Sequence, residues 1–274
     1  MGKGTIIGII VGFGALLLGF TLEEGNIMSL FLLSPAVIVI GGTIGALMVS
    51  YSVSDVTKMP KLIKEAASKP VVDFSKTLET MVDFATIVKK EGLLVLEETV
   101  KREDFAQTHD PIIIKGVDLM LENADKTIMK EVLENDVYVF EELKKREIAV
   151  FESAGGLSPT LGIIGTVLGL IQVLANMGSP EELAASIAVA FVATLYGVCL
   201  ANLVYLPIAN KLKLRLSLFM EEKGMIIDGL LAIHDFESPS VIKGRLSVYL
   251  NFGDKAKDKA PAETKEVREA DAKP

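Results

Sequence analysis

Two threonines are the residues of this sequence best placed to act on an ion, because each lies on a stripe of small residues in a long apolar segment. At helical spacing, the first stripe consists of Pro159, Gly162, Thr166 and Gly169. The second stripe, in a later segment, consists of Ala190, Thr194, Gly197 and Ala201. Such stripes suit either a narrow polar path or close packing of helices. Thr166 and Thr194 could therefore face an ion or a partner. Alternatively, each hydroxyl could bond only to a carbonyl of its own helix, which periodicity alone favours.

The apolar segments contain no side chain that could carry an ion by itself. No Asp, Glu, His, Lys or Arg lies within residues 5–21, 29–53, 153–177 or 183–209, and Glu152 lies only at the edge of the third segment. Transport of ions across a bilayer normally needs a charged or titratable group at membrane depth. Either the protein does not conduct, or a partner subunit supplies the carboxylate.

Other kinds of chemistry find little support. No nucleophile–base pair, phosphate-binding loop or metal-ligand spacing stands out, so we expect neither an enzyme nor a metal site. The single cysteine, Cys199, lies in an apolar run and is expected to be a packing residue. His109 and His234 are isolated. The net charge of −8, with no dense basic stripe, gives no reason to expect nucleic-acid binding.

Two prolines stand near the inner ends of the later apolar segments. Proline inside a helix removes one hydrogen bond and favours a kink. Pro159 and Pro207 could therefore produce local curvature only, or form a hinge that couples the apolar helices to the charged ones.

Two pairs of like charges lie in the polar middle of the chain. Lys89 and Lys90 precede Gly92-Leu93-Leu94, and Glu97 and Glu98 follow it. Such charges usually form a solvated face and contribute little to stability. A docking surface is the alternative interpretation.

The distribution of basic residues predicts the elements that carry these side chains. All 28 Lys and Arg residues lie outside two windows, which run from Lys3 to Lys58 and from Arg146 to Lys211. Each window holds two apolar runs separated by a short acidic stretch. Bilayer cores exclude charge, and cytoplasmic flanks collect Lys and Arg. We therefore expect an all-α integral membrane protein with four transmembrane helices in two hairpins and both chain ends in the cytoplasm.

The expected domains follow the same pattern. The chain divides into a first transmembrane hairpin (1–53), a cytoplasmic helical region (54–152), a second hairpin (153–209), C-terminal cytoplasmic helices (210–252) and a disordered tail (253–274). The first span is close to the lower length limit for crossing a bilayer and is expected to run with little tilt. No breaker separates the helix at about 126–146 from the third span, so one helix should run through both. Gly4, Gly8 and Gly12, and later Gly41 and Gly45, are expected at helix–helix seams.

Several segments resemble one known family. They are Pro159–Leu170, the stretch 193–197 (ATLYG), Ala201-Asn202, the stretch 206–212 (LPIANKL), Glu91–Glu97, and the stretch 228–233 (DGLLAI) with Pro239 and Tyr249-Leu250. In this order they resemble the MotA/PomA stator proteins of the bacterial flagellar motor. The resemblance covers roughly residues 3–250 and includes the order of the spans and both proline positions.

The resemblance implies a pentameric ring of this subunit around two copies of a single-span, MotB-like B subunit that carries the ion-binding aspartate. Ion flow would turn the ring against the rotor protein FliG, in the inner (cytoplasmic) membrane. Thr166 and Thr194 would line the ion path, and Pro159 and Pro207 would take the positions of the family's functional prolines. No cofactor is implied other than the transported H⁺ or Na⁺.

The resemblance also implies roles for the charge pairs, because Lys89, Lys90, Glu97 and Glu98 fall where the rotor-facing charges of the family lie. The first basic position of the family is often Arg, and here both are Lys, which keeps the charge but loses the fork geometry of a guanidinium.

Two alternatives remain open at the level of sequence. ExbB/TolQ-like proton-driven energisers of envelope transport share the Gly-Thr-rich third span, but they have one span before the cytoplasmic region, whereas residues 5–53 predict a hairpin. A non-conducting scaffold would use the two hydroxyls for packing only. The choice between H⁺ and Na⁺ does not follow from the sequence, and we lean to H⁺.

Overall fold

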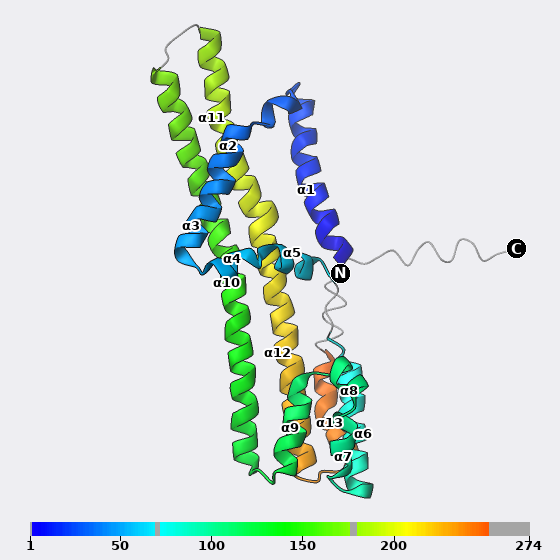
Figure 1. Ribbon diagram of the computed structural model, residues 1–274. Helices are drawn as coiled ribbons and strands as arrows, with labels where there is room; N and C mark the ends of the chain where they lie inside the picture. The colour runs from blue at the N-terminus through cyan, green and yellow to red at the C-terminus, as the bar shows by residue number, and fades with distance from the viewer. Residues whose placement is uncertain (1, 69–71, 176–179, 252–274) are drawn as a thin grey trace, which may run out of the picture. The chain divides into compact units, whose positions relative to one another are not determined.

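The computed structural model describes residues 2–68, 72–175 and 180–251, and these residues form helices joined by turns, with no strand among them (Figure 1). Contacts divide the chain into two compact units. We call residues 1–69 and 144–214 the apolar unit, and residues 70–143 and 215–274 the charged unit. Two helices, α10 (Lys126–Ala175) and α12 (Leu206–His234), have residues in both.

The apolar unit begins with α1 (Gly2–Leu22) and a broken helical stretch. That stretch consists of a 3-10 turn (Ile27–Leu30), α2 (Leu33–Ala36), a π-helical turn (Val37–Gly41) and α3 (Gly42–Ser50). The short helices α4 (Val53–Thr57) and α5 (Met59–Ala67) follow. The unit is completed by the second part of α10, by α11 (Pro180–Leu200), by a π-helical turn (Ala201–Tyr205) and by the start of α12. A proline has no N–H and cannot donate a hydrogen bond to the carbonyl four residues earlier. For Pro207 that carbonyl belongs to Leu203, which lies in the π-helical turn Ala201–Tyr205.

The apolar helices meet the length requirement for a membrane only in part. Three helical stretches among the described residues are long and apolar enough to cross a bilayer, namely Ile27–Ser50, Lys126–Ala175 and Ser186–His234. Ile6–Leu22 is apolar but shorter. The described parts of the expected spans fall mainly on apolar helices, and residues 176–177 of the third span lie outside the described residues. The four-span arrangement itself stays a prediction.

The helix expected to run without a break from about residue 126 is confirmed. Helix α10 is continuous over 50 residues and contains Pro159. Of the glycines expected at seams, only Gly12 has a neighbour within 4 Å of a would-be Cβ, the side chain of Leu203. Among the described residues of one chain, therefore, Gly4, Gly8, Gly41 and Gly45 do not form the predicted seams. The expected tail (253–274) lies outside the described residues.

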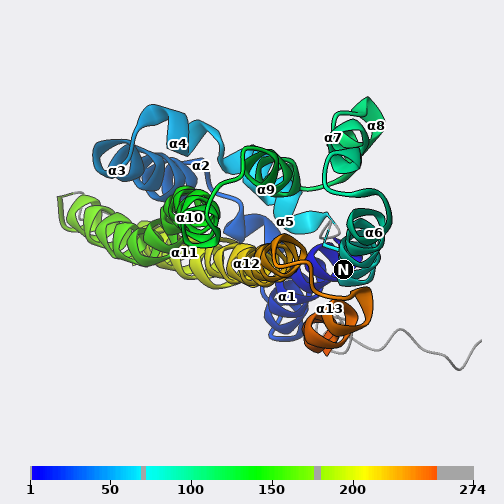
Figure 2. The same cartoon turned by 90° about the horizontal axis from the view of Figure 1, so that it is seen from below.

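The charged unit contains shorter amphipathic helices around an apolar core. They are α6 (Phe74–Glu91), α7 (Val95–Val100), α8 (Glu103–Thr108), α9 (Pro111–Leu121), the first part of α10, most of α12, α13 (Pro239–Leu246) and a 3-10 turn (Ser247–Tyr249). Figure 2 shows α13 alongside α6, with which it packs. Side-chain caps begin two of these helices, because Asp73 accepts hydrogen bonds from the first turn of α6 and Asp110 accepts one from that of α9.

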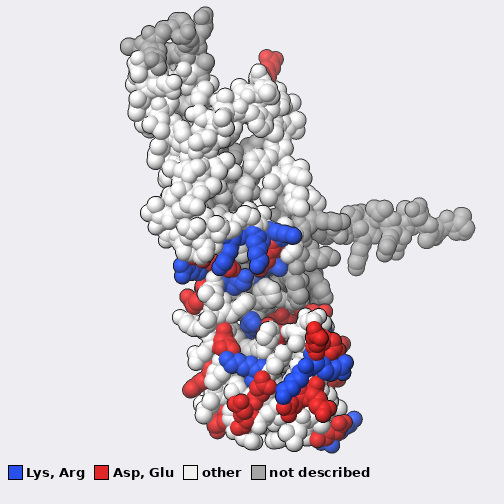
Figure 3. All heavy atoms as spheres, in the orientation of Figure 1, with Lys and Arg blue, Asp and Glu red and all other residues white. Residues whose placement is uncertain are grey.

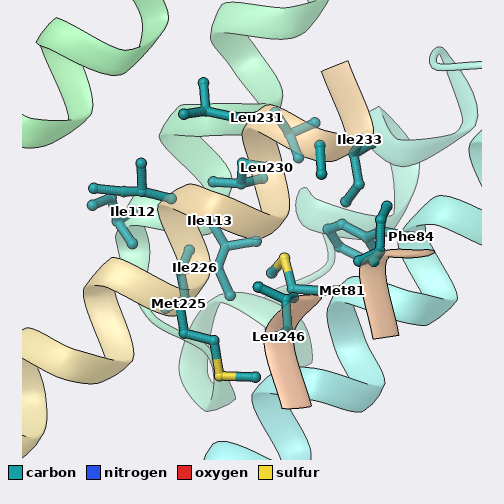
Figure 4. Packing of buried hydrophobic residues seen from close by; sticks show 14 of the residues in the cluster. Met81, Phe84, Ile112, Ile113, Met225, Ile226, Leu230, Leu231, Ile233 and Leu246 are labelled. Atoms are coloured by element: carbon teal, nitrogen blue, oxygen red, sulfur yellow. The ribbon is translucent and has the colours of Figure 1, made fainter. Parts of the chain in front are cut away.

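Large side chains fill the core of the charged unit, as Figure 4 shows. Met81, Ile113, Met225 and Leu230 are at most 2% exposed and come from α6, α9 and α12. One ion pair is also enclosed: Lys223 Nζ lies 2.8 Å from Asp110 Oδ2 and 4.6 Å from the centre of the Phe140 ring. Burial of this kind, with apolar faces inward and charges outward, is the ordinary arrangement of a water-facing helical unit.

Candidate ion site between α10 and α11

The two predicted stripes face each other. Figures 1 and 2 both show α10 and α11 lying side by side. A Cβ added to Gly197 would lie 2.5 Å from the Ser158 carbonyl oxygen and 3.1 Å from Pro159 Cα. One added to Gly162 would lie 2.9 Å from the Ala193 carbonyl oxygen. The backbones of the two helices therefore touch, and only glycine fits at these positions.

The two threonines meet where the stripes are closest. Thr166 Oγ1 lies 2.5 Å from Thr194 Oγ1, and either hydroxyl can be the donor. Thr166 Oγ1 also lies 2.9 Å from the Ala190 carbonyl oxygen and 3.2 Å from that of Gly162. Thr194 Oγ1 lies 3.4 Å from the same Gly162 oxygen.

These contacts decide between the two structural readings of the hydroxyls. Each hydroxyl reaches an atom of the other helix, so the alternative in which each serves only its own helix is wrong. Because a hydroxyl has one proton and two acceptor positions, the pair retains acceptor capacity after its contacts are made. Both side chains are only half-buried. The pair is thus a polar spot between two apolar helices, and both residues remain partly exposed.

The two prolines do not join this pair directly. Pro159 lies in α10 at the contact with Gly197, seven residues before Thr166. Pro207 is exposed, on α12 just after the π turn. Next to Pro159, the Ser158 hydroxyl is fully buried and has no hydrogen-bond partner in the part of the chain that the structure describes. The coupling role of the prolines stays a prediction.

The four predicted rotor-facing charges lie together at one end of α6 and the start of α7, in the charged unit. Lys89, Lys90 and Glu98 are exposed. Glu97 Oε1 lies 2.5 Å from Lys101 Nζ, and this hydrogen bond raises the pKa of Lys101. Gly92 ends α6 with a φ of 89°, a conformation that other residues rarely adopt.

Sequence reasoning missed two features of these sites. Leu94, between the charge pairs, is 74% exposed, an unusual position for a leucine beside four charges. Tyr196 Oη donates to the Leu30 carbonyl and lies 3.2 Å from Leu32 N, which ties α11 to the break before α2. The sequence shows that Leu94 lies between two basic and two acidic residues, and this pattern could have drawn attention to it. No local signal joined Tyr196 to residues more than 160 positions away.

Known proteins share this architecture. The chain is 32% identical over 257 residues to the chemotaxis protein PomA of Vibrio alginolyticus, which covers 93% of this chain and 98% of that protein. The chain belongs to the MotA/PomA family. Motility protein A of Bacillus subtilis is 29% identical over 278 residues, covering 99% of this chain and all of that protein.

Family profiles and solved structures agree with this assignment. Residues 105–225 match the MotA/TolQ/ExbB proton channel family, and residues 6–92 match the motility protein A N-terminal region. The second match favours the MotA/PomA branch over the ExbB/TolQ alternative. The flagellar MotAB stator complex from Bacillus subtilis has a TM-score of 0.83 and 28% identity, covering 93% of this chain and 98% of that one. The C. jejuni MotAB structure has a TM-score of 0.82 and 25% identity, covering 91% and 96%.

Proposed function

We propose that this chain is the A subunit of a flagellar stator and conducts H⁺ or Na⁺ together with a MotB-like B subunit. The observation that carries this proposal is the hydroxyl pair of Thr166 and Thr194, which bridges two helices of a MotA/PomA family member. The apolar segments on either side contain no carboxylate. An ion path here therefore needs a titratable group from another chain.

The proposed topology has four spans with both ends and residues 54–152 in the cytoplasm of the inner membrane. Its support is the placement of every Lys and Arg outside the two apolar windows. The proposed assembly is a ring of about five copies around the single-span helices of the B subunit, as the resemblance to the family implies. The glycines without neighbours in one chain leave room on α1 and α3 for such contacts.

In this mechanism the hydroxyl pair acts on the ion that the B-subunit aspartate carries. Removing water from an ion at membrane depth is costly unless polar ligands replace the lost hydration. With its proton already used in the contacts described above, each hydroxyl oxygen can accept a hydrogen bond from a hydrated proton or from the protonated aspartate, or it can coordinate sodium. The link between Thr166 and Thr194 holds both oxygens in one place before the ion arrives.

Replacing Thr194 tests this mechanism. Thr194→Val keeps the shape and removes the hydroxyl, whereas Thr194→Ser keeps the hydroxyl and serves as the matched control. Hydrogen bonds to charged groups contribute about 1.5–3 kcal/mol, so we expect ion uptake to fall by about 10- to 100-fold in Thr194→Val and to persist in Thr194→Ser. Thr166→Val should have the same direction with a smaller effect.

Ion uptake is measured in cells that co-express the B subunit, at matched membrane levels of the A subunit. Wild-type uptake and torque in Thr194→Val would restrict the hydroxyls to packing, whereas no uptake by the wild-type A–B complex would favour the scaffold alternative. Uptake by the chain without a B subunit would contradict the partner requirement. Swimming speed against sodium concentration at fixed pH distinguishes H⁺ from Na⁺.

The exposed charges at the end of α6 are the proposed contact with the rotor protein FliG. Lys89→Glu combined with Lys90→Glu should slow rotation while assembly and ion uptake persist. Charge reversal on the rotor should partly restore speed. Normal motility of the double variant would return these lysines to the status of a solvated face.

A further inference from the structure

Two short helices cross the end of the apolar helices instead of continuing them. Helices α4 and α5 follow α3 after a short turn, in which Ser52 caps α4, and Figure 1 shows them running across the direction of α1 and α3. Helix α5 packs beside α1. Figure 3 shows a band of basic side chains at this end of the charge-free surface. The helices therefore lie at the level where apolar surface gives way to charge.

Helix α5 presents two different faces. Leu62 and Ala66 are buried against the apolar unit. At helical spacing, the opposite face carries Lys61 and Lys64 on one side and Ile63, which is 40% exposed, on the other. A basic edge next to an apolar edge on an exposed helix is typical of helices that lie in the headgroup region of a membrane.

Four other basic side chains of the apolar unit are paired with acids. The ion pairs are Lys58 with Asp55 and Glu147, Lys144 with Glu65 and Glu147, Arg146 with Asp55, and Lys213 with Glu152. The Ser52 hydroxyl and the Arg146 guanidinium lower the pKa of Asp55, which stays charged at neutral pH. In contrast, Lys61 and Lys64 are exposed and have no acidic partner among the described residues.

We propose that the exposed face of α5 binds the headgroups of anionic phospholipids in the cytoplasmic leaflet, with Lys61 and Lys64 contacting the phosphates and Ile63 entering the acyl boundary. This inference rests on the proposed cytoplasmic placement of residues 54–152. The occupant is a lipid because the face continues the apolar surface of the membrane helices and adds two unpaired positive charges at its edge. An ammonium is a compact point charge that suits a phosphate oxygen.

The binding fixes the depth of the A subunit in the membrane. Helix α5 is joined to α3 through α4 and packs beside α1, so a contact that holds α5 at the headgroups also holds the first two apolar segments in register with the bilayer. Basic residues near an anionic surface each strengthen binding by about fivefold. The two lysines together should therefore concentrate anionic lipid beside α5 well above its level in the bulk membrane.

Because this chain contains no tryptophan, a single introduced tryptophan can serve as a fluorescent probe. Ile63→Trp places a fluorophore on the exposed face of α5, and the purified A–B complex is reconstituted into vesicles of phosphatidylglycerol and phosphatidylcholine. In one set of vesicles the phosphatidylglycerol is brominated, and in the other set the phosphatidylcholine is. Bromine quenches nearby tryptophan fluorescence, so the quenching shows which lipid lies beside position 63. The signal of the complex without Ile63→Trp is subtracted in each case. With phosphatidylglycerol as a minor component of the vesicles, at roughly a tenth of the lipid, we expect its brominated form to quench at least about fivefold more effectively than its bulk fraction predicts.

Removal of the two charges should abolish this preference. In Lys61→Gln/Lys64→Gln the two brominated lipids should quench in proportion to their bulk fractions. The control Lys130→Gln/Lys243→Gln removes two exposed lysines of the charged unit and should leave the preference intact. If Ile63→Trp prevents assembly, Val53→Trp, at a position 58% exposed at the start of α4, replaces it.

Three results would overturn the proposal. Quenching by neither lipid would mean that another copy of the chain covers α5, and equal quenching by both would leave an interfacial helix with no headgroup preference. A preference that survives Lys61→Gln/Lys64→Gln would exclude the lysines. The readout needs no ion flux or rotation, so a failed Thr194 experiment and a failed lipid experiment are independent outcomes.

Discussion

The two units of this protein bury their interiors in opposite ways. The charged unit encloses large side chains such as Met81, Ile113 and Leu230, and its surface is rich in charge. In the apolar unit, many large hydrophobic side chains are exposed, although Leu47 and Phe151 are buried, and Gly162 and Gly197 lie against backbone atoms of the neighbouring helix. Where water surrounds the helices, burying bulk stabilises them. Where lipid surrounds them, burying bulk brings no such gain, and close approach of backbones replaces it.

The difference teaches which kind of change each unit can absorb. A contact between flexible side chains can adjust to an added methyl group, whereas a contact between two backbones cannot. The charged unit should therefore tolerate compensated substitutions, and the apolar unit should not. The following three variants of the full complex test this expectation.

The largest effect is expected for Gly197→Ala. The new Cβ would lie 2.5 Å from the Ser158 carbonyl oxygen, so α10 and α11 would have to separate. Overpacking typically costs about 1–3 kcal/mol, and a backbone neighbour places this case above that range. We expect little or no assembled complex in membranes, as measured by co-purification with the B subunit. The control is Gly156→Ala, on the same helix α10, where no described atom of the chain lies within 4 Å of the added Cβ. Normal assembly of Gly197→Ala would show that the two units do not differ in this way.

The second effect concerns the core of the charged unit. Leu230 is fully buried, and Leu230→Ala should lower the free energy of unfolding by about 2–5 kcal/mol through the cavity it leaves. A Cβ added to Gly116 would lie 2.4 Å from Leu230 Cδ1, so Gly116→Ala should also destabilise the protein. In the double variant the added methyl enters the space left by Leu230, and the combined loss should be smaller than the sum. Thermal unfolding of the purified complex measures all three, and strict additivity would contradict the side-chain explanation.

The smallest effect is expected for Tyr249→Phe. The Tyr249 hydroxyl donates a 2.6 Å hydrogen bond to Asp228 Oδ2, and such a bond contributes about 1 kcal/mol. Burial and this carboxylate raise the pKa of Tyr249 from 10.0 to about 12. Because the folded-state pKa is raised, the contribution is complete below about pH 10 and is lost as the pH rises through 12. The difference in melting temperature between the wild-type complex and Tyr249→Phe should therefore shrink over this range. A difference that grows with pH would have the wrong sign.

The sequence predicted the elements well because charge and helical period are local signals. The windows without Lys or Arg coincide with apolar helices, and the absence of a breaker near residue 146 predicted the continuous α10. The two stripes were also identified correctly. Periodicity specifies which residues share one face of a helix, and Gly162 and Thr166 do share one.

The sequence could not show which other helix, if any, packs against each small-residue face. The same small-residue pattern occurs at Gly8, which has no neighbour in the chain, and at Gly197, which touches another backbone. Nothing in the local pattern distinguishes these cases, because the difference lies in a helix far away in the sequence. For the same reason the bond between Thr166 and Thr194 could not be inferred, and periodicity favoured the wrong alternative. Packing also groups α4 and α5 with the apolar helices, although their charges resemble those of the polar middle region.

The apolar stretch of α1, Ile6–Leu22, is short, and in the proposed topology its length has a consequence for the surrounding membrane. Ile6–Leu22 extends for about 26 Å at about 1.5 Å per residue, whereas the hydrocarbon core of a bilayer is about 30 Å thick. Each ångström of such mismatch costs a fraction of a kcal/mol, which bilayer thinning or reaching flanking residues can relieve. A ring of these subunits would therefore sit in a locally thinned annulus. Longer acyl chains in the membrane lipids would increase the elastic stress in this annulus, and shorter acyl chains would relieve it.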